Sequence, residues 1–114
     1  EHSNSMESTI KQAAIVKEII EIIENHLNVK VKFDSISYQR LIAHIRFALQ
    51  AIETNHPLHT IDTEMLTLIK LKYKDSYICA QKIKEMLKKE YAIDFPEAEL
   101  AYISLHIQNI FNQL

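Results

Sequence analysis

The chain has 114 residues, a formal net charge of −2 and an apolar fraction of 47%. This length suits one domain with a substantial hydrophobic core, and the slightly acidic balance argues against binding to nucleic acid or to an anionic membrane through bulk charge. The lone cysteine, Cys79, excludes an internal disulfide and is typical of a cytoplasmic protein. We expect neither a signal peptide nor a membrane span, because no apolar run approaches the ~20 residues that cross a bilayer.

Glycine is absent from the sequence. Phosphate-cradling loops and tight hairpin turns place backbone at positive φ, which glycine adopts most readily. The sequence therefore argues against Walker-type and Rossmann-type nucleotide sites and against a hairpin-based sheet. Helix ends should use asparagine instead, and Asn25, Asn28 and Asn55 stand where such ends are expected.

The N-terminal part of the chain predicts one long helix. Residues 1–8 are interpreted as an expression remnant or a linker, and residues 9–114 as a single domain. Apolar residues recur with a 3.6-residue period, which predicts a helix over about 7–27 with Ile19 and Ile23 on its inward face. Residues 28–35 follow as a connector.

Four further helices are expected after this connector. The second spans about 36–54 and ends before Pro57, because a residue that precedes proline is pushed out of the α region. Asp62 can cap the third, and Asp75 or Ser76 the fourth. The fifth opens at Pro96, with Glu97 and Glu99 complementing its dipole. The predicted inward residues of the third and fifth helices are Met65, Leu68, Ile69 and Leu71, and Leu100, Ile103, Ile107, Ile110 and Leu114. The expected fold is all-α, a compact five-helix bundle.

His44 stands at the border of the apolar stripe of the second helix. The two arginines of the chain, Arg40 and Arg46, both lie within four residues of it. Guanidinium groups match phosphate oxygens, so this grouping favours a phosphoryl group on the imidazole. The more ordinary interpretation is a structural histidine between two surface arginines.

His106 occupies the matching border position on the fifth helix, with Tyr102 on the same side, where its ring could bond to His106 or pack over it. Spacing alone does not show whether His44 and His106 lie near each other. His56 and His59 are interpreted as turn residues, because zinc usually takes four ligands and Cys79 is distant in the pattern. No metal site or cofactor is expected.

These residues resemble a known family. The patterns Tyr38-x-Arg40-x-x-x-His44-x-Arg46-Phe47 and Glu99-x-x-Tyr102-Ile-x-x-His106-Ile are similar to the two signature helices of the PTS regulation domain. The likeness covers about residues 10–112. Ala43 and the His-x-Arg-Phe pattern are more like a second copy of this domain than a first.

The resemblance implies a five-helix module, usually present in two copies, in bacterial antiterminators and activators of sugar operons. His44 and His106 would be phosphoacceptors, with Arg40, Arg46 and Tyr102 supporting the phosphate. The donors would be HPr or an enzyme II of the phosphotransferase system (PTS). Phosphorylation would change the packing of a homodimer and so control an RNA- or DNA-binding domain outside this chain. The protein would not be an enzyme.

Three other functions stay open. One is a relay bundle that passes a phosphoryl group between proteins, which would need one highly exposed histidine near lysine. Another is a nucleic-acid-binding surface formed by the lysines of residues 70–89, although these are more often the solvated face of two helices. The last is a helical oligomerisation module whose histidines are chemically inert.

Overall fold

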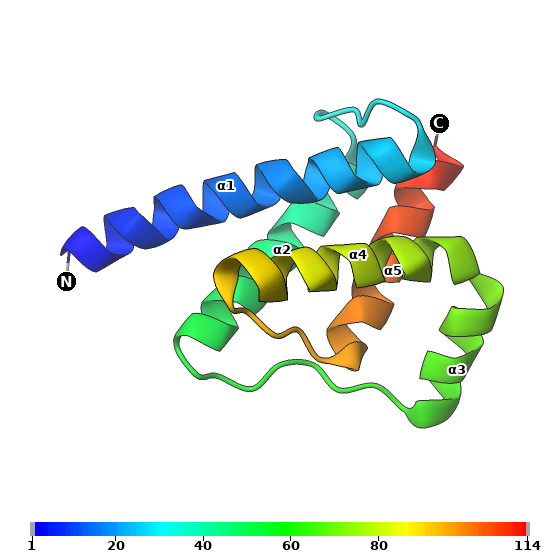
Figure 1. Ribbon diagram of the computed structural model, residues 1–114. Coiled ribbons are helices and arrows are strands. Elements are labelled where there is room, and N and C mark those ends of the chain that lie inside the picture. The colour runs from blue at the N-terminus through cyan, green and yellow to red at the C-terminus, as the bar shows by residue number, and fades with distance from the viewer. Residues whose placement is uncertain (1, 114) are drawn as a thin grey trace.

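The computed structural model describes residues 2–113, and side chains from residue 6 onward. This range forms five helices and no strand, which confirms the all-α prediction. The helices are α1 (His2–Leu27), α2 (Ile36–Glu53), α3 (Thr63–Lys72), α4 (Lys74–Tyr91) and α5 (Glu97–Asn112). In Figure 1, α1 runs along one side of the bundle, and its N-terminal end projects beyond the other helices.

The helix α5 is the centre of the fold. It packs against α2, α3 and α4, and α1 covers α2 and α4 from the other side. Its apolar stripe is buried as predicted at four of the five positions, and the fifth, Leu114, lies outside the described residues. The fully buried side chains from the other helices include Ile19, Ile23, Leu41, Ile45, Ile83 and Leu87. This core fixes α2 and α5 side by side, which is the arrangement that positions the two histidines.

Asparagine does replace glycine at two helix ends. Asn28 and Asn55 have φ values of 56° and 57°, just beyond α1 and α2, so the prediction is confirmed for both. Asn25 instead lies inside α1. The sequence did not indicate the third such residue, Ala92, which has φ 56° at the end of α4.

Several predicted helix starts are wrong by a few residues. The helix α1 begins at His2, earlier than about residue 7. Neither Asp75 nor Ser76 caps α4, because only Tyr73 separates α3 from α4 and both residues already lie in the first turn. Pro96 precedes α5 and does not open it, since the first helical residue is Glu97.

The expected inward face of α3 is largely wrong. Asp62 precedes this helix without a side-chain capping bond, and only Ile69 is buried. Met65, Leu68 and Leu71 are 50%, 54% and 75% exposed. The physical reason is position: α3 lies at the edge of the bundle, where it contacts only α4 and α5 substantially. Its other side is an apolar surface open to solvent.

None of the helices in residues 2–113 combines the length and the apolar character that a membrane-spanning helix requires.

Candidate functional site: a histidine cluster between α2 and α5

The two border histidines meet at the seam between α2 and α5. The ring centroids of His44 and His106 are 5.3 Å apart, and their planes are inclined by 50°. Both side chains are partly buried. The two positions singled out by the sequence therefore form one site within a single chain.

Glu99 holds the His44 ring in place. Its Oε1 lies 2.7 Å from Nε2 of His44, and the Glu99 side chain has no exposed surface. An ionised carboxylate only accepts hydrogen bonds, so Nε2–H of His44 donates and the lone pair of the neutral ring lies on Nδ1. The sequence indicated Glu99 as a partner of the helix dipole and as the first residue of the second signature pattern, without a contact to His44. Its spacing from the buried Ile103 and Ile107 was the available signal that it points inward.

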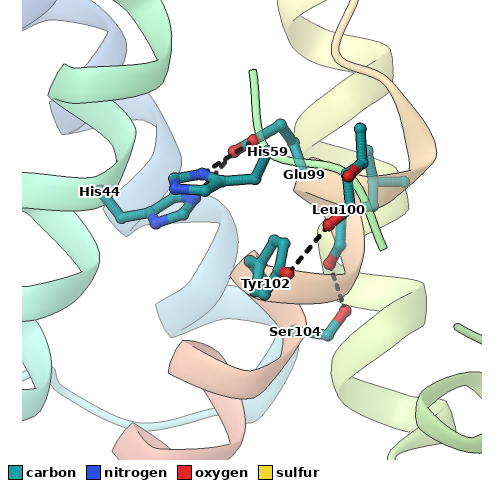
Figure 2. Close-up of polar contacts among 7 residues, drawn as sticks. His44, His59, Glu99, Leu100, Tyr102 and Ser104 are labelled. Carbon is teal, nitrogen blue, oxygen red and sulfur yellow. Dashed lines mark hydrogen bonds and ion pairs between the residues drawn. The ribbon is translucent and has the colours of Figure 1, made fainter. Parts of the chain in front are cut away.

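His59 completes the cluster from the loop between α2 and α3. Its ring stacks on that of His44, with centroids 5.6 Å apart and planes inclined by 22° (Figure 2). Its Nδ1 lies 3.6 Å from Oε2 of Glu99. His59 lies in a loop, as expected, but its contacts with His44 and Glu99 were not predicted. No sequence signal indicated them, because a loop position has no periodicity.

The loop that carries His59 is fastened at both ends. The backbone N–H of His56 donates to Ala51 O at 2.7 Å, and the hydroxyl of Tyr102 donates to Thr60 O at 3.1 Å. Tyr102 does not take the expected place against His106. Its ring contacts His44 and His59 instead, with centroids 5.9 and 5.5 Å away, because its hydroxyl reaches toward the loop.

Comparison with known proteins decides the family. Residues 3–110 match the model of the PRD domain. The chain belongs to the PRD domain family. It is 26% identical to the transcription antiterminator LicT of Bacillus subtilis, over 99% of the chain and 41% of that protein. It is also 30% identical to the protein GlcT of Staphylococcus haemolyticus, over 98% of the chain and 40% of that protein. The chain thus spans about two fifths of these relatives.

The surroundings of His106 in this PRD domain lower the pKa of its imidazole. Burial lowers the pKa of His106 below its ordinary value of 6.5, and the nearby charges of His44 and Arg40 lower it further. The neutral ring, which carries a nucleophilic lone pair, is therefore favoured near neutral pH.

Both arginines lie on the surface of α2, and Arg40 is the one placed a turn away from His44 on the same side of the helix. Arg40 and Arg46 are both exposed, and the charge of Arg40 acts on His106 as described above. Arg40 is thus electrostatically coupled to the site. Exposed guanidinium groups on flexible stems are free to turn toward a newly attached anion.

The lysine-rich segment of this PRD domain is partly engaged in contacts within the chain. Lys70 pairs with Glu97 at 2.7 Å, and Lys84 pairs with Asp94 at 2.8 Å. These exposed pairs fit the interpretation of a solvated helix face. Cys79 is buried, and burial raises the pKa of its thiol to about 12, so it offers no reactive thiolate.

Proposed function

We propose that this PRD domain is a regulatory phosphoacceptor module of a bacterial transcriptional antiterminator. HPr or a PTS enzyme II would phosphorylate His44 and His106 in the cytoplasm. The modification would alter the packing of a homodimer and thereby control an RNA- or DNA-binding domain elsewhere in the protein. Membership of the PRD domain family and the likeness to LicT and GlcT support this role.

The observation that carries the proposal is the contact between His44 and the buried Glu99. With Nε2–H donated to Glu99, the lone pair on Nδ1 of His44 is available for attack on phosphorus. A P–N bond forms at His44 as the bond between phosphorus and the donor's side chain breaks. The electron pair of that broken bond leaves with the donor. The chain needs no catalytic group of its own, which fits a protein that is modified and is not an enzyme.

The Glu99 carboxylate would also link phosphorylation of His44 to a change in helix packing. A phosphoryl group carries nearly two negative charges at neutral pH. Attached to Nδ1, this group lies on the far side of the ring from Glu99, and at an effective dielectric constant of about 20 a charge of about −2 roughly 6.5 Å from the carboxylate repels it by about 5 kcal/mol. Shifting a two-state equilibrium from one form to the other takes about 5 kcal/mol. Repulsion between phosphorylated His44 and Glu99 is therefore of the size needed to change how α2 packs on α5.

Arg40, Arg46 and Tyr102 have supporting roles in this proposal. Arg40 and Arg46 would turn toward the phosphoryl oxygens and offset part of the new charge. Tyr102 would act less directly, because its hydroxyl already fastens the loop through Thr60. It would keep His59 stacked on His44 and so preserve the shape of the acceptor site.

An exposed aromatic ring beside the histidine cluster would suit self-association. The ring of Phe47 is 53% exposed and lies 5.5 Å, centroid to centroid, from that of His59. The exposed apolar residues of α3 lie at the edge of the bundle. Apolar area of this kind commonly marks a protein–protein contact. A change at His44 would reach Phe47 through the stacked His59 ring.

Incubation with phosphoenolpyruvate, enzyme I and HPr, with and without enzyme II components, tests the proposal. We expect an acid-labile mass increase that maps to His44, His106 or both and disappears in the His44→Ala/His106→Ala double variant. His56→Ala is the matched control, since His56 is exposed and bonded to Thr54. Absence of the modification would favour an inert oligomerisation module. Rapid onward transfer to a second protein would favour a relay.

A further inference from the structure

We propose that His44, His59 and Glu99 also form a binding site for one divalent metal ion of the zinc class. These residues come from α2, the loop before α3, and α5, respectively. Each offers one ligand atom, and the three atoms lie within 4.8 Å of one another. The proposal goes beyond the phosphoacceptor function, and the metal site itself does not depend on it.

The donor set has the chemistry that zinc prefers. Two imidazole nitrogens and one carboxylate oxygen are a common set of protein ligands for a tetrahedral ion with a fourth position left to water. With metal–ligand bonds of about 2 Å, the ligand atoms lie roughly 3.3 Å apart. The contacts of the two carboxylate oxygens lie on either side of this separation: Oε1 of Glu99 is 2.7 Å from Nε2 of His44, and Oε2 is 3.6 Å from Nδ1 of His59. Small side-chain rotations would close the site.

A second observation points to a ligand independently of the spacing. Oε2 of Glu99 is buried and has no hydrogen-bond partner among the described residues. Such an atom is uncommon, because burial of an unpaired polar group is costly. A cation between Oε2 and the two rings would supply the missing partner. The carboxylate thus has unused binding capacity on the side that faces His59.

His59 gives the proposed metal site access to solvent. Its side chain is 50% exposed, whereas that of His44 is 14% exposed and that of Glu99 is fully buried. The ion can therefore enter from the loop side. On binding, His44 changes tautomer: Nε2 gives its proton to solvent, Nδ1 takes one up, and the neutral ring gives the lone pair of Nε2 to the metal. The ion then joins α2, the loop and α5.

Metal binding and phosphorylation would compete for the same ring. The metal would fix His44 between Glu99 and His59 with its proton on Nδ1, so that neither ring nitrogen keeps a lone pair for attack on phosphorus. This antagonism, unlike the metal site, rests on the proposed function. A divalent ion would then hold the domain in its unphosphorylated packing.

Zn²⁺ titration of the whole chain, followed by calorimetry and by competition with a chromophoric chelator, tests the site. We expect one ion per chain and a tenfold or greater loss of affinity in His59→Ala and in Glu99→Gln. His56→Ala, on the same loop, should bind as the wild type does. Co²⁺ should give the visible absorption bands of tetrahedral coordination, and His59→Ala should abolish them.

The proposal is overturned if no stoichiometric binding occurs, if His59→Ala binds Zn²⁺ as the wild type does, or if His56→Ala loses as much affinity. His59 is exposed, so its variant keeps the test valid even where a Glu99 variant fails to fold. The antagonism is measured separately, with purified phosphorylated HPr as donor. Saturating Zn²⁺ should slow modification of His44 at least tenfold in the wild type but not in His59→Ala. If metal-free His44 is never modified, the phosphoacceptor function fails and the metal site stands.

Discussion

Glu99 on α5 holds the ring of His44 on α2 through a 2.7 Å contact made by a side chain with no exposed surface. This contact fixes which nitrogen of His44 carries the proton. It also places a carboxylate where a phosphoryl group on His44 would be opposed by like charge. The contact thus holds the His44 ring, and under the proposed function it would also oppose a phosphoryl group attached to that ring.

The contact predicts the tautomer of His44. In the neutral ring, the proton should reside on Nε2, because that nitrogen faces the carboxylate oxygen. Imidazole ¹⁵N–¹H correlation spectra should show one Nε2–H tautomer in the wild type and a mixture in Glu99→Ala. A proton on Nδ1 of His44 in the wild type would contradict the arrangement.

Stability should fall as the solution is acidified through the titration of His106. Its pKa is lowered in the folded chain, so below pH 6.5 the unfolded state binds more protons at this residue than the folded state does. The contribution of the neutral His106 ring to the free energy of unfolding is complete above pH 6.5. It is lost as the pH falls through the folded-state pKa of His106. Urea unfolding at pH 7.5, 6.5 and 5.5 measures the decline in the free energy of unfolding.

His106→Gln should show a shallower decline in the free energy of unfolding over this range. His56→Gln is the control, because His56 is an exposed loop residue. Equal declines in the wild type and His106→Gln would show that other groups dominate the pH response.

Ala92→Gly should stabilise the fold by about 1 kcal/mol. Ala92 ends α4 at φ 56°, a left-handed conformation that costs a residue with a Cβ roughly 1–2 kcal/mol. Part of this gain is offset by the greater chain entropy of glycine in the unfolded state. Urea denaturation measures the difference. Ala13→Gly, at an exposed position inside α1, should instead destabilise by about 1 kcal/mol.

Truncation of a buried and of an exposed side chain of α3 should change the free energy of unfolding by different amounts. Ile69→Ala should cost about 2–4 kcal/mol because Ile69 is 3% exposed in the core. Leu71→Ala should change the free energy of unfolding by less than about 0.5 kcal/mol, since Leu71 is 75% exposed. Thermal and urea unfolding of dilute protein distinguish these outcomes. Similar losses in both variants would mean that Leu71 is covered in solution.

The sequence predicted most of the fold because periodicity reports burial directly. The apolar stripe of α5 follows a 3.6-residue period, and this helix packs as that period indicates. The period of α3 was misleading, because amphipathicity does not reveal whether a helix lies in the middle or at the edge of a bundle. Ala92 escaped notice because alanine is not a residue that usually signals a helix end.

The site was predictable only in part. His44 and His106 were recognisable from their border positions and from the family resemblance, and the structure brings them together. His59 could not be predicted, since its place depends on the path of a loop with no repeating pattern. The inward role of Glu99 was accessible from its spacing, but an acidic residue in a first helical turn has the simpler explanation of dipole compensation.

Sedimentation equilibrium of the phosphorylated and unphosphorylated chain tests the central claim most directly. We expect the dimer dissociation constant of the wild type to change tenfold or more on phosphorylation at His44. In Glu99→Gln, which removes the opposing charge but keeps the shape of the side chain, the change should be much smaller. A dissociation constant that stays within twofold on full phosphorylation of wild-type His44 would contradict the account.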